Sequence, residues 1–283
     1  MKRRRICVAA IQLLAHDRSA LGAVWPGIAR QIRAAAAGGA QLAVLPEGTL
    51  PAYVLGRMPF DSSEISGILS ECAGLAGELG LVLVVGAARA HDGRVYNSAI
   101  VYDADGSVAG SADKHFLWHF DRQWFAQAEA IAPVPTSIGN LGVLICADGR
   151  IPLISRSLVD RGAELLVMPT AWVTSGRDPN ALENIQADLL ARMRARENGV
   201  PFVAANKCGV EMQCVAYCGK SQIVASDGSV VALAPQTRPA VLMGSLELGA
   251  PKPSRAKLPV ISLARGEPDR MMRVAITTDA ARG

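Results

Sequence analysis

Short runs of β-branched and aliphatic residues alternate along this chain with longer segments rich in alanine and leucine. This alternation is typical of strands separated by helices, so the sequence predicts the α/β class. Strands are expected in RICVAAIQL from Arg5, QLAVLP from Gln41, LVLVVGAAR from Leu81, VYNSAIVYD from Val95, LGVLICA from Leu141, ELLVMP from Glu164 and VPFVAAN from Val200. Helices are expected at about 20–38, 62–79, 152–162 and 181–198, where apolar residues recur at helical spacing.

Two Asp-Gly pairs interrupt this pattern. DADGSV from Asp103 and SDGSVV from Ser226 each place such a pair between two predicted strands, which indicates a tight hairpin. Some strands should therefore pair antiparallel. After Leu248 the sequence GAPKPSRAKLP becomes rich in proline and basic residues. We expect one folded domain over 1–250 and a proline-rich, basic C-terminal segment over 251–283, either a tail or an arm that covers a partner subunit.

Composition excludes several other classes of protein. With 283 residues, of which 50% are hydrophobic, the chain can bury a large core. It has no apolar run of the roughly 18 residues that a membrane-spanning helix needs, and its basic start lacks the features of a signal peptide. The net charge of +4 is spread along the chain, so nucleic acid is not predicted as a partner.

Cysteine usage bears on location and on metals. Six cysteines in a chain of this length are too few for a disulfide scaffold, which favours free thiols and a cytoplasmic location. Cys208, Cys214 and Cys218 lie close together, but their spacing is not that of a CxxC metal site. No metal site is predicted there, and ordinary buried thiols are expected.

One cysteine stands where a predicted strand gives way to a predicted helix. Cys146 follows the apolar run LGVLI, and ADGRIP leads from it to the helix expected from Pro152. A thiol on such a turn projects from the edge of the sheet, where helix-end amides or cations can lower its pKa. Cys146 is therefore a candidate nucleophile, although a small buried side chain at a strand end is an alternative interpretation.

Two charged residues follow other predicted strands. Glu47, in QLAVLPEGTLPAY, could accept the proton of a thiol and later return it to a leaving amine. Lys114, in GSADKHFLWHFDRQWF, has aromatic neighbours, and its ammonium could stabilise an oxyanion. Taken singly, a solvated glutamate or helix cap and an ordinary surface lysine would explain these residues as well.

The order and spacing of these residues, with their neighbouring motifs, resemble the amidase-type branch of the nitrilase-like carbon-nitrogen hydrolase superfamily. The motifs are AAIQL, LPEGTLPAY, DKHFLW, ICADGRIP, RGAELLVMPTAW, ARENGVPFVAANKCG and GKSQIVASDGSVVA. The resemblance implies a four-layer αββα sandwich that usually dimerises, and an amidohydrolase that needs no metal or organic cofactor. It also implies a Glu-Lys-Cys triad of Glu47, Lys114 and Cys146, with the backbone amide of Ala147 joining Lys114 in an oxyanion hole.

The resemblance extends to the pocket. Tyr53 and Trp172 match aromatic positions that commonly line it in the family, although core packing would explain them equally. His115 and His119 are near the site in sequence, but the family does not use a histidine base. Neither histidine is therefore predicted to be catalytic.

The sequence also departs from the family pattern. Many members carry a second glutamate in a Glu-Arg-x-x-Phe context, where this chain reads DRQWF, so Asp121 stands in its place with one methylene fewer. Glu129 lies too far past Phe125 to replace it. We expect Asp121 to reach Lys114 directly or through a water. The pattern C-x-D-x-R-x-P-E ends here as CADGRIPL, so Leu153 also replaces a glutamate.

Residues after the cysteine bear on the substrate. Ala147-Asp148 resembles the amidase branches, whereas true nitrilases usually carry Trp-Glu. Gly149 resembles the aliphatic amidases and cannot hold a carboxylate, as an arginine often does at this position in hydrolases of N-carbamoyl amino acids. Arg150 is expected to pair with Asp148 rather than to contact substrate.

The leading hypothesis is a cysteine-dependent hydrolase of a small linear amide that forms a thioester and releases ammonia or an amine. An N-carbamoyl amide hydrolase is the first alternative, and a nitrile hydrolase or an ammonia-supplying glutaminase domain are others. Asp121, Leu153 and the unusual C-terminal segment leave open a catalytically impaired nitrilase-like protein that binds a metabolite or partner. The expected partners are a small-molecule amide and a second copy of the chain, in a homodimer or larger homo-oligomer, without nucleic acid or membrane.

Overall fold

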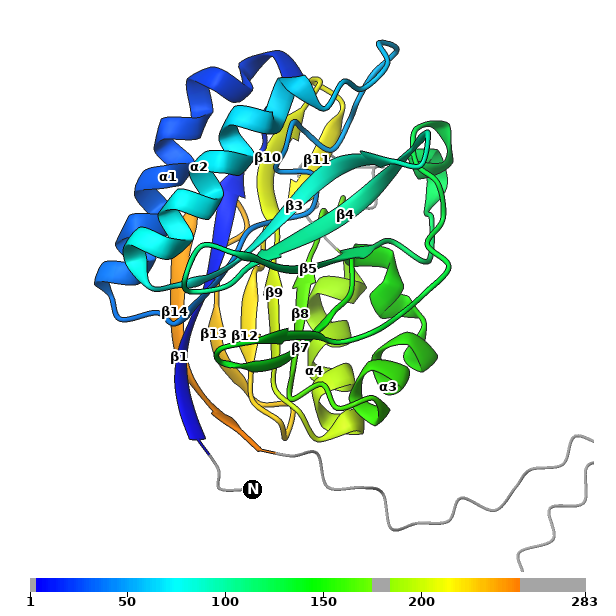
Figure 1. Ribbon diagram of the computed structural model, residues 1–283. Coiled ribbons are helices and arrows are strands. Elements are labelled where there is room, and N and C mark those ends of the chain that lie inside the picture. The colour runs from blue at the N-terminus through cyan, green and yellow to red at the C-terminus, as the bar shows by residue number, and fades with distance from the viewer. Residues whose placement is uncertain (1–3, 175–183, 250–283) are drawn as a thin grey trace, which may run out of the picture. The chain divides into compact units, whose positions relative to one another are not determined.

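The computed structural model describes residues 4–174 and 184–249, which form two β-sheets flanked by helices (Figure 1). The fold is the predicted α/β, four-layer αββα sandwich. The segment 251–283 and residues 181–183 of the expected fourth helix lie outside the described residues.

The first sheet is built around three parallel strands, β1, β2 and β3. Its strand order is β11-β10-β1-β2-β3-β4-β5, and β14 also pairs with β1. The strands are β1 (Arg4–Leu14), β2 (Leu42–Val44), β3 (Val82–His91), β4 (Arg94–Tyr102), β5 (Val108–Asp113), β10 (Lys207–Glu211), β11 (Val215–Cys218) and β14 (Ala240–Leu248).

Side chains of these strands alternate between two cores, as the period of a β-strand requires. In β1, Ile6, Val8 and Ala10 join the core between the sheets, whereas Ala9 and Ile11 join the core under the outer helices. The outer helices are α1 (Leu21–Ala37) and α2 (Ser63–Leu79), preceded by the short 3-10 helix η1 (Arg18–Ala20). Figure 1 shows α1 and α2 side by side over this sheet.

The second sheet has the order β13-β12-β9-β8-β7-β6, with β7, β8 and β9 parallel. Its strands are β6 (Val134–Thr136), β7 (Gly139–Val143), β8 (Leu165–Pro169), β9 (Phe202–Ala205), β12 (Gln222–Val224) and β13 (Val230–Leu233). Its helices are α3 (Pro152–Asp160) and α4 (Ile185–Asn198), and two 3-10 helices, η2 (His119–Gln123) and η3 (Cys146–Arg150), lie near the strand ends.

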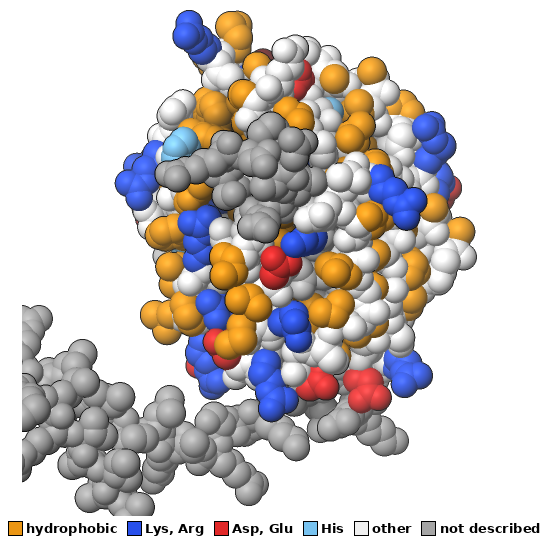
Figure 2. Space-filling view, turned by 180° about the vertical axis from the view of Figure 1, so that it is seen from behind, with side chains coloured by type: hydrophobic (Ala, Val, Ile, Leu, Met, Phe, Trp, Pro, Cys, Tyr) orange, Lys and Arg blue, Asp and Glu red, His pale blue; other side chains and the backbone are white. Residues whose placement is uncertain are grey.

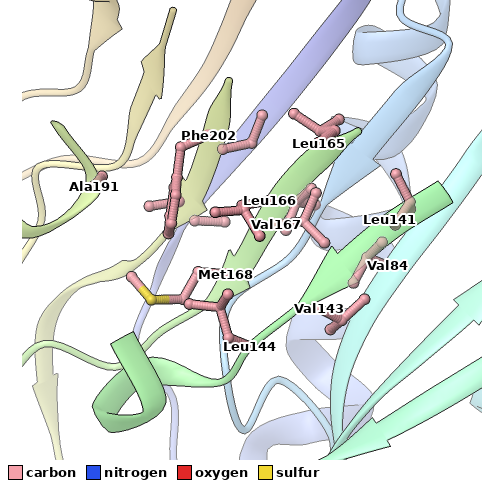
Figure 3. Close-up of a cluster of buried hydrophobic side chains, with 14 of the residues drawn as sticks. Val84, Leu141, Val143, Leu144, Leu165, Leu166, Val167, Met168, Ala191 and Phe202 are labelled. Carbon is pink, nitrogen blue, oxygen red and sulfur yellow. The ribbon is translucent and has the colours of Figure 1, made fainter. Parts of the chain in front are cut away.

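A continuous apolar core packs the second sheet against the first sheet and against α3 and α4. Figure 3 draws part of it, where Leu141 and Val167 of the second sheet lie near Val84 of the first. These side chains are fully buried. Burial of apolar surface on this scale supplies most of the driving force for folding, at roughly 25 cal/mol per Å².

The predicted strands, helices and both Asp-Gly hairpins are present, but some boundaries differ. The strand expected from Leu141 ends at Val143, because Cys146 begins a 3-10 turn in place of continuing the strand. The strands β6, β10, β11 and β14 were not among the expected ones, and β5, β12 and β13 were expected only as parts of the Asp-Gly hairpins. β14 pairs with β1 over Arg4–Gln12, a contact between the two ends of the domain that no local pattern reveals.

Candidate active site

Three polar side chains converge where strands of the two sheets end. Glu47 lies three residues beyond β2, Lys114 directly follows β5, and Cys146 opens η3 just after β7. Carboxyl ends of parallel strands are where α/β proteins place their ligands. Sequence reasoning placed all three residues after strands, and the structure brings them to one site.

The loop that carries Glu47 packs directly against β3. A Cβ atom at Gly86 would lie 2.2 Å from the carbonyl oxygen of Pro46 and 2.7 Å from the Cα of Glu47, so only glycine allows this approach. The backbone amides of Thr49 and Leu50 donate to the Gly86 carbonyl at 2.9 and 3.0 Å. The backbone of Glu47 is therefore fixed by a neighbouring strand.

The Glu47 carboxylate is fully buried. Its Oε1 accepts hydrogen bonds from the Lys114 ammonium at 2.6 Å and from the Asn97 side-chain amide at 2.7 Å. Its Oε2 has no hydrogen-bond partner within the described ranges. One oxygen thus fixes the carboxylate, and the other remains available to accept a proton.

Lys114 is also fully buried and lies between two carboxylates. Its Nζ donates to Glu47 and, at 2.7 Å, to Oδ2 of Asp121. Burial by itself would lower the pKa of Lys114, but the charges of Glu47, a Cys146 thiolate and Asp121 raise the pKa overall. The side chain is therefore held as a buried cation.

Asp121 makes the direct contact with Lys114 that its position in the sequence suggested. It lies in η2 and is fully buried, and its Oδ2 also accepts from the backbone amide of Trp118 at 2.8 Å. Its Oδ1 accepts from the Tyr53 hydroxyl at 3.0 Å. The shorter side chain thus has a full set of partners without an intervening water.

Cys146 occupies a strained turn. Its φ is 45°, in the left-handed region that side chains with a Cβ rarely adopt, and such conformations cluster at functional sites. Burial and, to a smaller extent, the charge of Glu47 raise the pKa of the thiol, Lys114 lowers it, and the net pKa is about 12. The neighbouring Thr170 side chain and Ala171 backbone amide also lower the pKa of the thiol. The thiol is neutral at pH 7, so an attack on substrate requires a base to remove its proton.

Asp148 connects the cysteine turn to the lysine loop. Its carboxylate accepts from the backbone amide of Ile145 at 3.0 Å and from those of His115 and Phe116 at 3.0 and 2.7 Å. The prediction that Arg150 pairs with Asp148 was wrong. Arg150 donates to Gln186 at 2.7 Å, and its guanidinium lies 5.3 Å from the centre of the Trp118 ring.

The other predicted pocket residues are buried close to these side chains. Ala147 and Trp172 are 0% and 1% exposed, and the backbone amide of Trp172 donates to Asn206. The indole Nε1 of Trp172 has no hydrogen-bond partner within the described ranges. Gly149 is required for packing, because a Cβ there would lie 2.7 Å from Leu190 and 2.9 Å from the Met168 sulfur.

Several residues from the sequence comparison lie away from this cluster. Leu153, which stands where a glutamate is expected, is 71% exposed at the start of α3, so its replacement leaves the buried site intact. His119 and Glu129 are exposed. His115 lines a separate cavity of about 660 Å³ bordered also by β5, which none of Glu47, Lys114 and Cys146 lines.

Three features of the site were not predicted from the sequence: the presence of Asn97, the presence of Thr170, and the hydrogen bonds that Asp148 accepts from backbone amides. Asn97 interrupts the apolar strand VYNSAIVY, and a polar side chain that is 2% exposed inside such a strand needs a partner, here Glu47. That interruption was the available signal. Thr170 follows β8 directly, as Lys114 follows β5, and the same rule could have identified it.

A buried thiol, a carboxylate and an ammonium near the strand ends of an αββα sandwich point to a hydrolase of carbon-nitrogen bonds. Residues 7–255 match the family model described as carbon-nitrogen hydrolase. The chain belongs to this family, in its nitrilase-like, amidase-type branch, and is a carbon-nitrogen hydrolase.

Individual relatives support the same assignment. The bovine (Bos taurus) deaminated glutathione amidase is 31% identical over 84% of this chain and 76% of that protein. A protein named probable nitrilase from Schizosaccharomyces pombe is 32% identical over 57% of this chain, and the match spans just over half, 56%, of that relative.

Among solved structures, a mutant of the amidase from Nesterenkonia sp. AN1 superposes with a TM-score of 0.77 and 25% identity. The match covers 85% of this chain and 90% of that one. In that structure the acetamide moiety of fluoroacetamide is covalently added at the active-site cysteine.

Two further observations concern membranes and metals. Among the described residues, no helix combines the length and apolar character needed to cross a bilayer. Over the same residues, no three His, Cys, Asp or Glu side chains gather as a metal site would require.

Proposed function

We propose that this enzyme hydrolyses a small linear amide, with Cys146 as nucleophile, Glu47 as general base and Lys114 as an electrostatic stabiliser. The observation that carries the proposal is the buried chain of contacts from Asp121 through Lys114 to Glu47, whose Oε2 is left without a partner among the described residues. The charges of Glu47 and Lys114 both act on the Cys146 thiol.

The first half of the reaction forms a thioester. Glu47 takes the thiol proton as Sγ of Cys146 bonds to the amide carbon, and negative charge develops on the carbonyl oxygen. The Lys114 ammonium and the backbone amide of Ala147 are the proposed donors to that oxygen. Glu47 then returns the proton to the nitrogen, the carbon-nitrogen bond breaks, and ammonia or an amine leaves.

The second half releases the acid. A water attacks the thioester carbon and Glu47 accepts a proton from it. Glu47 then passes that proton to the departing sulfur as the carbon-sulfur bond breaks, which gives a carboxylic acid, the Cys146 thiol and the Glu47 carboxylate. The Lys114 ammonium is held by two carboxylates and does not need to transfer a proton in either half. Its proposed contribution is a fixed positive charge in a site of low dielectric constant.

The direct contact between Asp121 and Lys114 favours an active enzyme over an impaired binding protein. Asp121 lacks a methylene relative to the family's glutamate, yet its carboxylate has three partners and is fully buried. An N-carbamoyl amide substrate remains the alternative within the same chemistry, because it differs only in the group beside the attacked carbon.

The test is intact-protein mass spectrometry after incubation with a panel of amides, N-carbamoyl amides and nitriles. A substrate that acylates Cys146 should add its mass minus that of the amine or ammonia released, and the adduct should disappear as acid accumulates. The panel member that reacts identifies the substrate class. An unmodified cysteine and no released amine across the whole panel would refute the proposal and favour a binding protein.

We also propose that the enzyme forms a homodimer or larger homo-oligomer. On α4, Ile185, Leu189 and Met193 recur every four residues on one face and are 71%, 49% and 50% exposed. Such a stripe on a surface helix is typical of a protein-protein contact.

Basic side chains are scattered among apolar ones on the face drawn in Figure 2, which offers no continuous track for nucleic acid. A cytoplasmic location stays a prediction.

A further inference from the structure

A second buried ion pair lies beside the site and takes no part in the proposed chemistry. Lys207 and Glu211, at the two ends of β10, are both 0% exposed, and their charged groups are 3.2 Å apart. Burial of two charges carries a desolvation cost, so a buried ion pair is weak evidence of stabilisation by itself. The position of this pair therefore requires another explanation.

Each member of the pair holds a different end of the loop that carries Glu47. The Lys207 ammonium donates to the backbone carbonyl of Gly48, the residue after Glu47, at 2.8 Å. Oε1 of Glu211 accepts from the backbone amide of Val54, the residue after Tyr53, at 2.6 Å. The ion pair and these two hydrogen bonds thus connect the two ends of the loop of residues 48–54.

This loop is folded tightly on itself. Gly48 has a φ of 55°, and a Cβ there would lie 2.5 Å from the Cα of Tyr53, so the two ends of the loop are in backbone contact. Residues 51–62 contain no helix or strand that could hold the loop by its own hydrogen bonds. Movement at either end would therefore be transmitted to the other.

Aromatic side chains link the pair to the site. The Lys207 ammonium lies 6.0 Å from the centre of the Tyr53 ring and 5.4 Å from that of Tyr217, within the range of cation-π attraction. The Tyr217 hydroxyl donates to Glu211 at 2.7 Å, while the Tyr53 hydroxyl donates to Asp121. Tyr53 is therefore held on one side by the ion pair and reaches the partner of Lys114 on the other.

We propose that Lys207 and Glu211 are positioning residues that fix the loop bearing Glu47 and Tyr53, and thereby set the distance between the base and the nucleophile. The inference rests on the proposed roles of Glu47 and Cys146. Misplacement of a catalytic group by about 1 Å can lower a rate by a factor of about a hundred. Loss of the Gly48 contact should therefore lower kcat about tenfold to a hundredfold and change KM by less than about threefold.

The experiment separates positioning from stability with two variants. Lys207→Met removes the Gly48 contact and leaves the Glu211 charge unpaired, so both melting temperature and kcat should fall. In Lys207→Met/Glu211→Gln no charge is unpaired, and the amide oxygen can still accept from Val54. The double variant should regain much of the lost melting temperature without regaining kcat.

The matched control is Gln222→Leu. Gln222 lies on β12, away from the loop, and the substitution removes its buried hydrogen bond to the Ala187 carbonyl. It should lower the melting temperature while kcat stays within about twofold, because buried hydrogen bonds contribute to stability wherever they lie. Recovery of kcat in step with the melting temperature in the double variant would overturn the inference, as would a proportionate loss of kcat in the control.

Amide hydrogen exchange of the segment 45–58 provides a readout that does not need turnover. Exchange of its backbone amides should be faster in the double variant than in the wild type and unchanged in Gln222→Leu. If the wild type hydrolyses none of the panel, the proposed function fails, and exchange still decides whether the pair holds the loop. Unchanged exchange in the double variant would refute the positioning role.

Discussion

Glu47→Gln removes the proposed base and preserves most of its surroundings. Oε1 of Glu47 accepts from Lys114 and Asn97, and a glutamine carbonyl oxygen can accept the same two hydrogen bonds. The glutamine NH₂ then takes the place of Oε2, which has no partner among the described residues. The substitution therefore tests proton transfer with little change in packing.

The expected effects on turnover and on thiol reactivity differ in direction. A positioned general base contributes about 10²- to 10⁴-fold, so kcat should fall by that factor, equivalent to about 2.7 to 5.4 kcal/mol of activation free energy. The charge of Glu47 raises the pKa of the Cys146 thiol, so its removal should lower that pKa. Direct alkylation of Cys146 by a small haloamide should then persist or become faster.

The assay measures ammonia release from the best amide and, in parallel, the rate of alkylation by fluoroacetamide or iodoacetamide from intact mass. Glu164→Gln is the matched control, since Glu164 is a buried carboxylate paired with Arg4 outside the site. Its kcat should stay within about twofold, in line with removal of a pair distant from the chemistry. Near-wild-type turnover of Glu47→Gln would contradict the assigned role.

The remaining predictions concern the nucleophile and the strand behind the base. Cys146→Ala should remain folded, with turnover and active-site labelling both lost; residual activity near that of the wild type would exclude this nucleophile. The native thiol keeps its proton up to about pH 12, whereas the ordinary value is 9.0. Its contribution to stability is therefore complete below about pH 9 and is lost as the pH rises toward 12. Urea unfolding between pH 8 and 11 should show a decline that Cys146→Ala makes shallower by up to about 1.4 kcal/mol per pH unit. Gly86→Ala should push the Glu47 backbone aside and cost on the order of 1 to 3 kcal/mol with a fall in kcat. Gly74→Ala in α2, where the added methyl meets nothing within 4 Å, should stabilise by about 0.5 to 1 kcal/mol and leave kcat unchanged.

Much of this architecture could be predicted from local sequence, for identifiable physical reasons. The strands β1, β3 and β8 are continuous apolar runs because both faces of their sheets are covered, and the hairpins follow Asp-Gly pairs. The contacts that fix the loop after Glu47 could not be predicted. Lys207 and Gly48 are far apart in sequence, and their meeting depends on β10 pairing with the end of β1.

Asp121 shows how backbone geometry compensates for a shorter side chain. With one methylene fewer, Asp121 was expected to reach Lys114 directly or through a water, and η2 brings it within 2.7 Å of the Lys114 ammonium, so the contact is direct. Both of its oxygens are already partnered, and the residue is 0% exposed. A glutamate there would have to displace Trp118 or Tyr53, at a cost on the order of 1 to 3 kcal/mol for overpacking.

Asp121→Glu should therefore lower both stability and kcat, even though glutamate is the residue that the family carries at this position. Asp121→Asn preserves the volume of the side chain and removes its charge. The Lys114 ammonium would therefore lose one of the two negative charges that balance it. The substitution should slow hydrolysis about tenfold to a hundredfold with a smaller loss of stability. Kinetics of both variants on the best amide, with circular dichroism to verify folding, distinguish the two effects. If the kcat and stability of Asp121→Glu equal or exceed those of the wild type, the space around this carboxylate is not limiting. If Asp121→Asn equals the wild type, its charge has no part in holding Lys114 for catalysis.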